Sequence, residues 1–140
     1  MTEDDVDNTI AGGHADIMVA HDAPYVQDIQ RRIAGNPHGF DQRDIDYAEV
    51  GRKMIDRAFS GVQPKVFLHG HYHFFVRDRI IWDNHRVSNV IGFDADSSDN
   101  SFGFLETDDF SVSVAPNQRE GFLVQQGWSE KEARYLVDRR

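Results

Sequence analysis

Apolar runs and an amphipathic stretch follow one another along the first part of the chain, and their order predicts an α/β fold. Residues 16–20 and 65–69 are short and apolar, which is typical of strands buried on both faces of a sheet. Between them, residues 44–60 carry apolar side chains on one helical face. This pattern predicts two parallel neighbouring strands joined by that helix in a right-handed crossover.

Capping and turn residues indicate where the elements of this first part end. Thr2 is an N-cap candidate for a short N-terminal helix, which Gly12-Gly13 would end. Gly61 is the expected C-terminal stop of the 44–60 helix. Residues 25–43 are polar and contain loop-forming residues, so we expect an irregular connection there.

After residue 73 the pattern changes to short alternating segments, which predict a β meander and, with the first part, an α/β fold with a mixed sheet. The expected strands are 74–82, 86–93, 102–107 and 110–114. Because Pro116 breaks the pattern, we expect one domain over 1–115. Residues 116–140 would form a C-terminal tail with a short helix, whose capping box begins at Ser129.

Composition limits the classes of function. The 140 residues carry 24 acidic and 15 basic side chains, a net charge of -9, which argues against a generic nucleic-acid surface. The absence of cysteine excludes disulfides, thiolate-bound zinc and thiol catalysis. No apolar run approaches the roughly 20 residues of a membrane span, and the N-terminus lacks signal-peptide features. A cytoplasmic protein without membrane contact is the expectation.

Histidine is the residue type that points to chemistry in this sequence. His21 follows the first predicted strand, and His69, His71 and His73 follow the second. Ligands bind beyond the carboxyl ends of strands in open α/β sheets, so these histidines are expected at one edge. Gly70 lets the chain turn so that the imidazoles on both sides reach inward. Neutral imidazole suits Zn, Mn or Fe, with carboxylates completing the shell.

The two histidine motifs together resemble the C-terminal half of the calcineurin-like metallophosphoesterases. His21-Asp22-Ala23-Pro24 matches the family's His-Asp-x-Pro, and Gly70-His71-Tyr72-His73 matches its Gly-His-x-His, in the same order and about 50 residues apart. The resemblance covers residues 1–114. It implies the C-terminal half of an αββα sandwich and hydrolysis of phosphate mono- or diesters at a two-metal site. In that site His21 and His71 would bind one divalent ion and His73 the other, the ions being Mn, Fe, Zn or Ni.

The resemblance lacks the family's N-terminal motifs: Asp-x-His, Gly-Asp-x-x-Asp and Gly-Asn-His-Asp/Glu are absent before His21. They carry the bridging carboxylate and a catalytic histidine. We therefore expect an N-terminal half, on a separate chain or missing, or a second copy, to complete the site, and at most one ion to bind this chain alone. Asp83-Asn84-His85 and Gly35-Asn36-Pro37-His38 imitate two of these motifs, but turn and loop composition is the better interpretation.

Three residues beside the motifs are candidates for supporting the site or lining a pocket. Asp22 suits a turn or a hydrogen bond to a ligand, and His69 either orients a ligand or is a buried histidine. Tyr72 should point away from the metals. Because the surface is acidic, positive charge for a phosphate ester is expected from metal.

Two other functions fit the same sequence. One is a non-catalytic binding module on a truncated metallophosphoesterase fold. The other is a lone three-histidine site that binds one ion weakly.

Overall fold

The computed structural model describes residues 1–96, 98–114, 127, 129 and 131. The chain divides into two compact units, Met1–Phe93 and Asp94–Arg140. The predicted domain boundary at residue 115 and nearly all of the predicted C-terminal helix fall outside the described residues.

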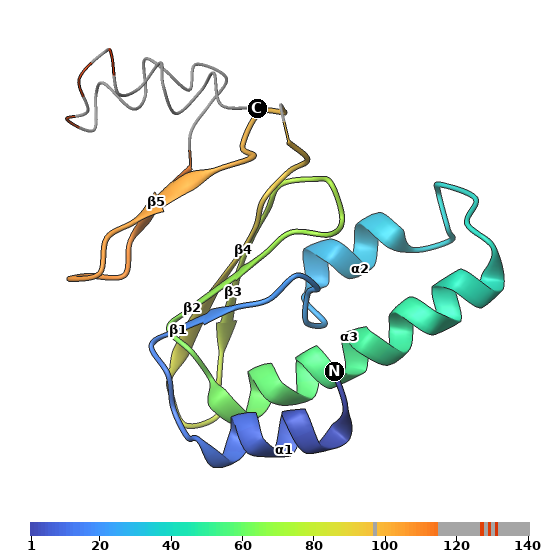
Figure 1. Cartoon of the computed structure of the whole chain (residues 1–140), viewed down its shortest axis with the longest axis horizontal. Coiled ribbons are helices and arrows are strands. Elements are labelled where there is room, and N and C mark those ends of the chain that lie inside the picture. Colours follow the sequence, from blue (N-terminus) through green and yellow to red (C-terminus); the bar gives the residue numbers. More distant parts are fainter. Residues whose placement is uncertain (97, 115–126, 128, 130, 132–140) are drawn as a thin grey trace. The chain divides into compact units, whose positions relative to one another are not determined.

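The first unit contains a four-stranded mixed sheet, as the sequence predicts (Figure 1). Its strands are β1 (Ile17–Val19), β2 (Val66–His69), β3 (Val76–Ile81) and β4 (Val87–Gly92), in the order β1-β2-β4-β3. β1 and β2 are parallel, with Ile17 opposite Val66 and Val19 opposite Leu68. The expected parallel pair is therefore confirmed.

Residues 74–114 form two hairpins and not one continuous meander. β3 and β4 pair antiparallel, but β4 lies between β2 and β3. The side chains explain this order, since Val90 and Ile91 of β4 are buried whereas β3 exposes Arg77 and Arg79, as an edge strand can. In the second unit, β5 (Gly103–Leu105) and β6 (Val112–Val114) form a separate antiparallel pair.

Three helices belong to the first unit. The expected N-terminal helix is α1 (Glu3–Ala11), with a capping box between Thr2 and Asp5. The connecting helix is α3 (Gln42–Val62), somewhat longer than predicted.

A further helix corrects the expectation of an irregular segment over 25–43. α2 (Gln27–Ile33) lies within that segment. Val26 and Ile29 are fully buried and Ile33 packs against the core. These apolar residues at helical spacing stabilise the short helix, although the residues between them are polar.

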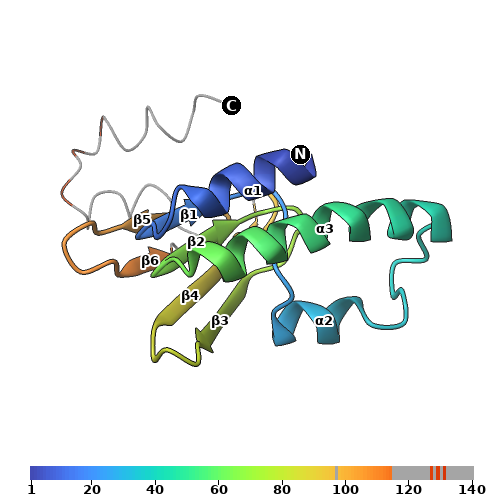
Figure 2. The ribbon, with the colours of Figure 1, turned by 90° about the horizontal axis from the view of Figure 1, so that it is seen from below.

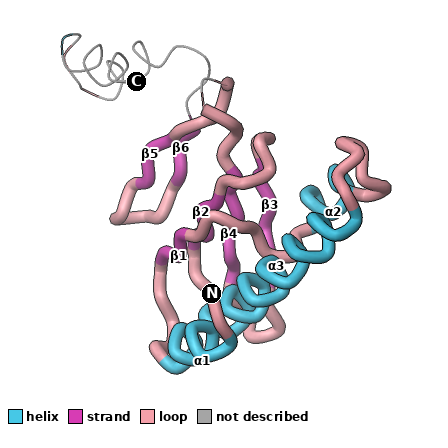
Figure 3. Tube along the Cα trace, turned by 45° about the vertical axis from the view of Figure 1, so that its right-hand side comes forward, coloured by secondary structure: helices cyan, strands magenta, loops and turns pink. Residues whose placement is uncertain are grey.

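The core of this unit lies between the sheet and the helices α2 and α3. Ile29 of α2 and Ile55 and Phe59 of α3 pack against Phe67 and Val90 of the sheet. Figure 3 shows the strands side by side, with α3 running along the unit. None of the helices among the described residues has the length and apolar character that crossing a membrane requires.

Gly61 lies inside α3 and does not end it, contrary to the prediction. The helix runs to Val62, and Gln63 caps it in the left-handed conformation, with φ 50°. A Cβ on Gly61 would come within 2.6 Å of Cγ1 of Ile10. Glycine therefore permits the close approach of α1 to α3, which lie side by side in Figures 1 and 2. Arg57 also forms ion pairs with Glu3 and Asp7 across this contact.

Two glycine substitutions in α3 test this packing. Gly61→Ala should lower the free energy of unfolding by roughly 1–2 kcal/mol, since overpacking against branched Ile10 outweighs the gain in helix propensity. Gly51→Ala is the matched control, because its Cβ would meet Asp22 Oδ2 at an ordinary 3.6 Å. The control should stabilise by up to about 1 kcal/mol in urea denaturation. Equal stabilisation by both changes would contradict the packing.

Candidate functional site

Backbone pairing between the first two strands continues past their ends. The Ala20 amide donates to the Leu68 carbonyl at 3.0 Å, and the Gly70 amide donates to the His21 carbonyl at 3.2 Å. The segments that follow β1 and β2 are thus held side by side. As a result, the rings of His21 and His71 lie 5.1 Å apart between centroids, at an interplanar angle of 65°.

The separation of this histidine pair, His21 and His71, fits a shared metal ion. Two imidazoles on one tetrahedral ion, with metal–nitrogen distances of about 2.0–2.1 Å, have ring centroids about 5 Å apart. Both side chains are exposed and accessible to an ion. Across the described part of the chain, however, no three side chains of His, Asp or Glu are grouped to hold a metal. The pair therefore offers two imidazoles, whereas a tetrahedral ion takes four ligands.

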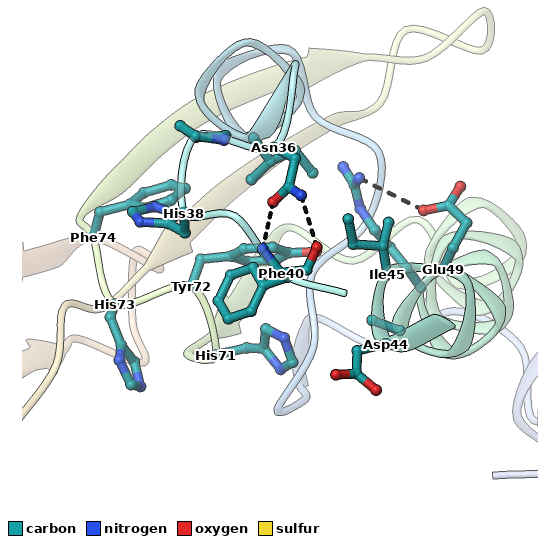
Figure 4. A pocket seen from close by; sticks show the side chains of 14 residues that line it. Asn36, His38, Phe40, Asp44, Ile45, Glu49, His71, Tyr72, His73 and Phe74 are labelled. Carbon is teal, nitrogen blue, oxygen red and sulfur yellow. Dashed lines mark hydrogen bonds and ion pairs between the residues drawn. The ribbon is translucent and has the colours of Figure 1, made fainter. Parts of the chain in front are cut away.

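His73 lies apart from the histidine pair. It lines a pocket that His71 also lines, but Figure 4 shows its ring extending away from that of His71. Both residues have a left-handed backbone, with φ 71° for His71 and 53° for His73. Such backbone is uncommon for residues other than glycine and tends to occur at functional sites.

Tyr72 anchors the loop between these two histidines. Its amide donates to the Gly70 carbonyl at 2.9 Å, and its ring packs against the core. The ring also contacts that of His71, with centroids 4.8 Å apart. Burial raises the pKa of Tyr72 to about 12, so its hydroxyl stays neutral. The loop is therefore fixed from inside while its histidines face outward.

His69 is buried beneath the site, with 3% of its surface exposed. Its Nδ1 donates to the Gly70 carbonyl at 3.0 Å, and Nε2 has no hydrogen-bond partner among the residues that the structure describes. The ring fills the space over Gly92, where an added Cβ would lie 2.4 Å from Cε1 of His69. Burial lowers the pKa of His69, so the ring is neutral near pH 7.

The Asp22 carboxylate binds to the backbone of the turn next to the histidine pair. Its Oδ1 accepts a hydrogen bond from the Ala23 amide at 2.8 Å. Its Oδ2 faces α3, at 3.6 Å from the position of a Cβ on Gly51. The carboxylate therefore stabilises the turn after β1, which is one of the two roles that the sequence suggests.

Arg52 is a functional candidate that the sequence reasoning missed. It lies on the apolar face of α3 with 4% exposure, and its guanidinium stacks over the Tyr25 ring at 4.4 Å. Its nearest acceptors are distant: the Pro24 carbonyl at 3.5 Å and Glu49 Oε2 at 4.0 Å. A charged residue at a core position of the helical pattern was the available signal. Arg52 thus places a positive charge in the lining of a pocket that the acidic composition did not suggest.

A pocket of about 630 Å³ lies between α3, the 36–40 loop and the loop of residues 71–73, the histidine loop (Figure 4). Asn36 closes its rim by exchanging two hydrogen bonds with the Phe40 backbone, at 2.8 and 2.9 Å. Arg52, Glu49 and Asp44 contribute its charged groups. Six rings line it, from His38, Phe40, His71, Tyr72, His73 and Phe74.

The two motif-like segments differ in where they lie. His38 belongs to this pocket wall. Asp83-Asn84-His85 forms the turn of the β3–β4 hairpin, where Asn84 Oδ1 accepts from the Arg86 amide at 3.1 Å.

Comparison with protein-family models, curated proteins and solved structures finds no match to the chain.

Burial of His69 predicts a pH dependence of stability. The folded state binds fewer protons than the unfolded state once the pH falls below the unfolded value of 6.5, so the free energy of unfolding should drop on acidification from pH 7.5 to 5.5. His69→Asn should be less stable at pH 7.5 but lose less on acidification. Urea denaturation in the presence of a chelator measures both. An unchanged pH dependence in the variant would show that His69 is not the group responsible.

Proposed function

We propose that this chain supplies part of a two-metal phosphoesterase site, carried on the C-terminal half of an αββα sandwich. The observation that supports the proposal most is the histidine pair, His21 and His71, at the carboxyl ends of adjacent parallel strands. Both residues belong to the motifs that resemble the metallophosphoesterases. In α/β sheets this edge is where ligands bind.

In the proposed site the three histidines are divided between two ions. Neutral imidazoles of His21 and His71 hold one divalent ion, of Mn, Fe, Zn or Ni, and His73 belongs to the second. Bound there, the ions supply a Lewis acid for the phosphoryl oxygens and lower the pKa of water. Tyr72 keeps the histidine loop in place through its ring contact with His71, and the buried His69 does so through its hydrogen bond to the Gly70 carbonyl.

Further ligands must join the histidines to hold two ions. Imidazoles are neutral, so carboxylates are needed to balance the charge of two divalent ions at short separation. We propose that an N-terminal half of the phosphoesterase or a second copy provides them. β1 forms the outer edge of its sheet and Val19 is 71% exposed, which suits the approach of another segment on that side.

A non-catalytic binding module is the second candidate function. The ring-lined pocket favours it, because a pocket of this volume suits a small organic ligand without any metal. In that case the histidine pair would be part of the wall of a binding surface.

Metal titration separates these two functions. Zn²⁺ should bind the chain with one equivalent, and His21→Ala or His71→Ala should weaken binding at least about tenfold, since each removes one of few ligands. His85→Ala is the matched control, because its backbone is also left-handed, with φ 66° against 71° for His71. Calorimetry measures the affinities. Equal affinities in all variants would contradict a metal site at the pair.

The activity of the chain alone should be very low. Without a bridging carboxylate and a general acid, we expect hydrolysis of a chromogenic phosphodiester with Mn²⁺ to remain near background, since a positioned acid alone typically contributes about 10²–10⁴-fold. Addition of an N-terminal half with the missing carboxylates should raise the rate. Robust turnover by the 140-residue chain that His71→Ala abolishes would show that the chain, or a homodimer of it, supplies every ligand.

A further inference from the structure

The pocket beside the histidine loop is lined by many ring-bearing side chains. Phe40, Tyr72 and Phe74 provide aromatic surface, and His38, His71 and His73 provide imidazole surface. Phe40 is 62% exposed although it is a large apolar side chain. Flat rings gathered in one pocket lining favour a flat ligand, because π faces and edges attract one another at close range.

The pocket lining also contains a buried cation, the guanidinium of Arg52. The Arg52 guanidinium lies 4.4 Å from the centroid of the Tyr25 ring and 5.8 Å from that of Tyr72. Its Nε is buried without a hydrogen-bond partner among the described residues, so this wall keeps an incompletely satisfied cation. Cations of this kind interact favourably with the electron-rich face of an aromatic ring. Arg52 therefore adds a positive charge to the aromatic lining of the pocket, next to Tyr25 and Tyr72.

One residue connects the pocket to the histidine pair. His71 lines the pocket and also lies 5.1 Å from His21, centroid to centroid. A ligand in the pocket thus has one end next to the place where a phosphoryl group would be held.

We propose that the pocket binds the planar aromatic group of the phosphate ester, a nucleobase or a simple aryl ring, with the ester end beside His71. That the ligand is a phosphate ester rests on the proposed function. Binding of its aromatic ring needs no metal. Specificity for the aromatic group would then come from stacking on Phe40 and Phe74 of the pocket lining.

The test is an NMR titration of the metal-free full chain with three probes: adenosine for a nucleobase, phenol for an aryl ring and cyclohexanol as the saturated match of phenol. Adenosine or phenol should bind and shift the Phe40 and Phe74 ring signals. Phe40→Ala should weaken that binding about fivefold or more, since stacking on one aromatic side chain typically contributes about 1–3 kcal/mol.

Tyr47→Ala is the matched control, because Tyr47 is an 83% exposed aromatic residue of α3 outside the pocket lining. It should leave binding unchanged. Binding of adenosine alone assigns a nucleobase and binding of phenol alone assigns an aryl ring, and either supports the proposal.

Three results would overturn it: no binding of either aromatic probe, cyclohexanol binding as tightly as phenol, or equal weakening by Tyr47→Ala and Phe40→Ala. Failure of the phosphoesterase proposal shows separately, in the Zn²⁺ titration of His21 and His71, in which neither Phe40 nor the probes take part.

Discussion

The parallel pairing of β1 with β2 is the interaction on which the site depends. Its register sets Val19 opposite Leu68, and the amides of Ala20 and Gly70 continue the pairing past the strand ends. Two segments about 50 residues apart in sequence therefore leave the sheet at one edge. A slip of one residue would send alternate side chains to the opposite face and separate the histidine pair.

Buried side chains are the second constraint on the histidine loop. Tyr72 packs into the core and His69 fills the space over Gly92, so the histidine loop rests on buried groups at two points. Arg52 of α3 lies near Tyr72, which couples the connecting helix to the same loop. The helix that crosses between the strands thus also builds the pocket wall. This shared construction explains why His71 belongs to the pocket and to the pair at once.

The sequence predicted the features that strong local patterns determine. Apolar runs on either side of an amphipathic helix identified the parallel pair, and Thr2 identified the first helix. α2 was missed because Val26 and Ile29 are separated by polar residues over barely two turns. The place of β4 depends on tertiary burial that alternation does not encode.

The site was predictable to a similar extent. Motif spacing pointed to His21 and His71, which do lie together. The separate position of His73 depends on left-handed backbone within a short loop, and the role of Arg52 depends on its two tyrosine neighbours. The most direct test of the account is a crystal structure of the chain with Zn²⁺, located by anomalous scattering. We expect an ion bound by ring nitrogens of His21 and His71 at about 2.0–2.1 Å. An ion held elsewhere, with these two rings more than about 10 Å apart, would contradict it.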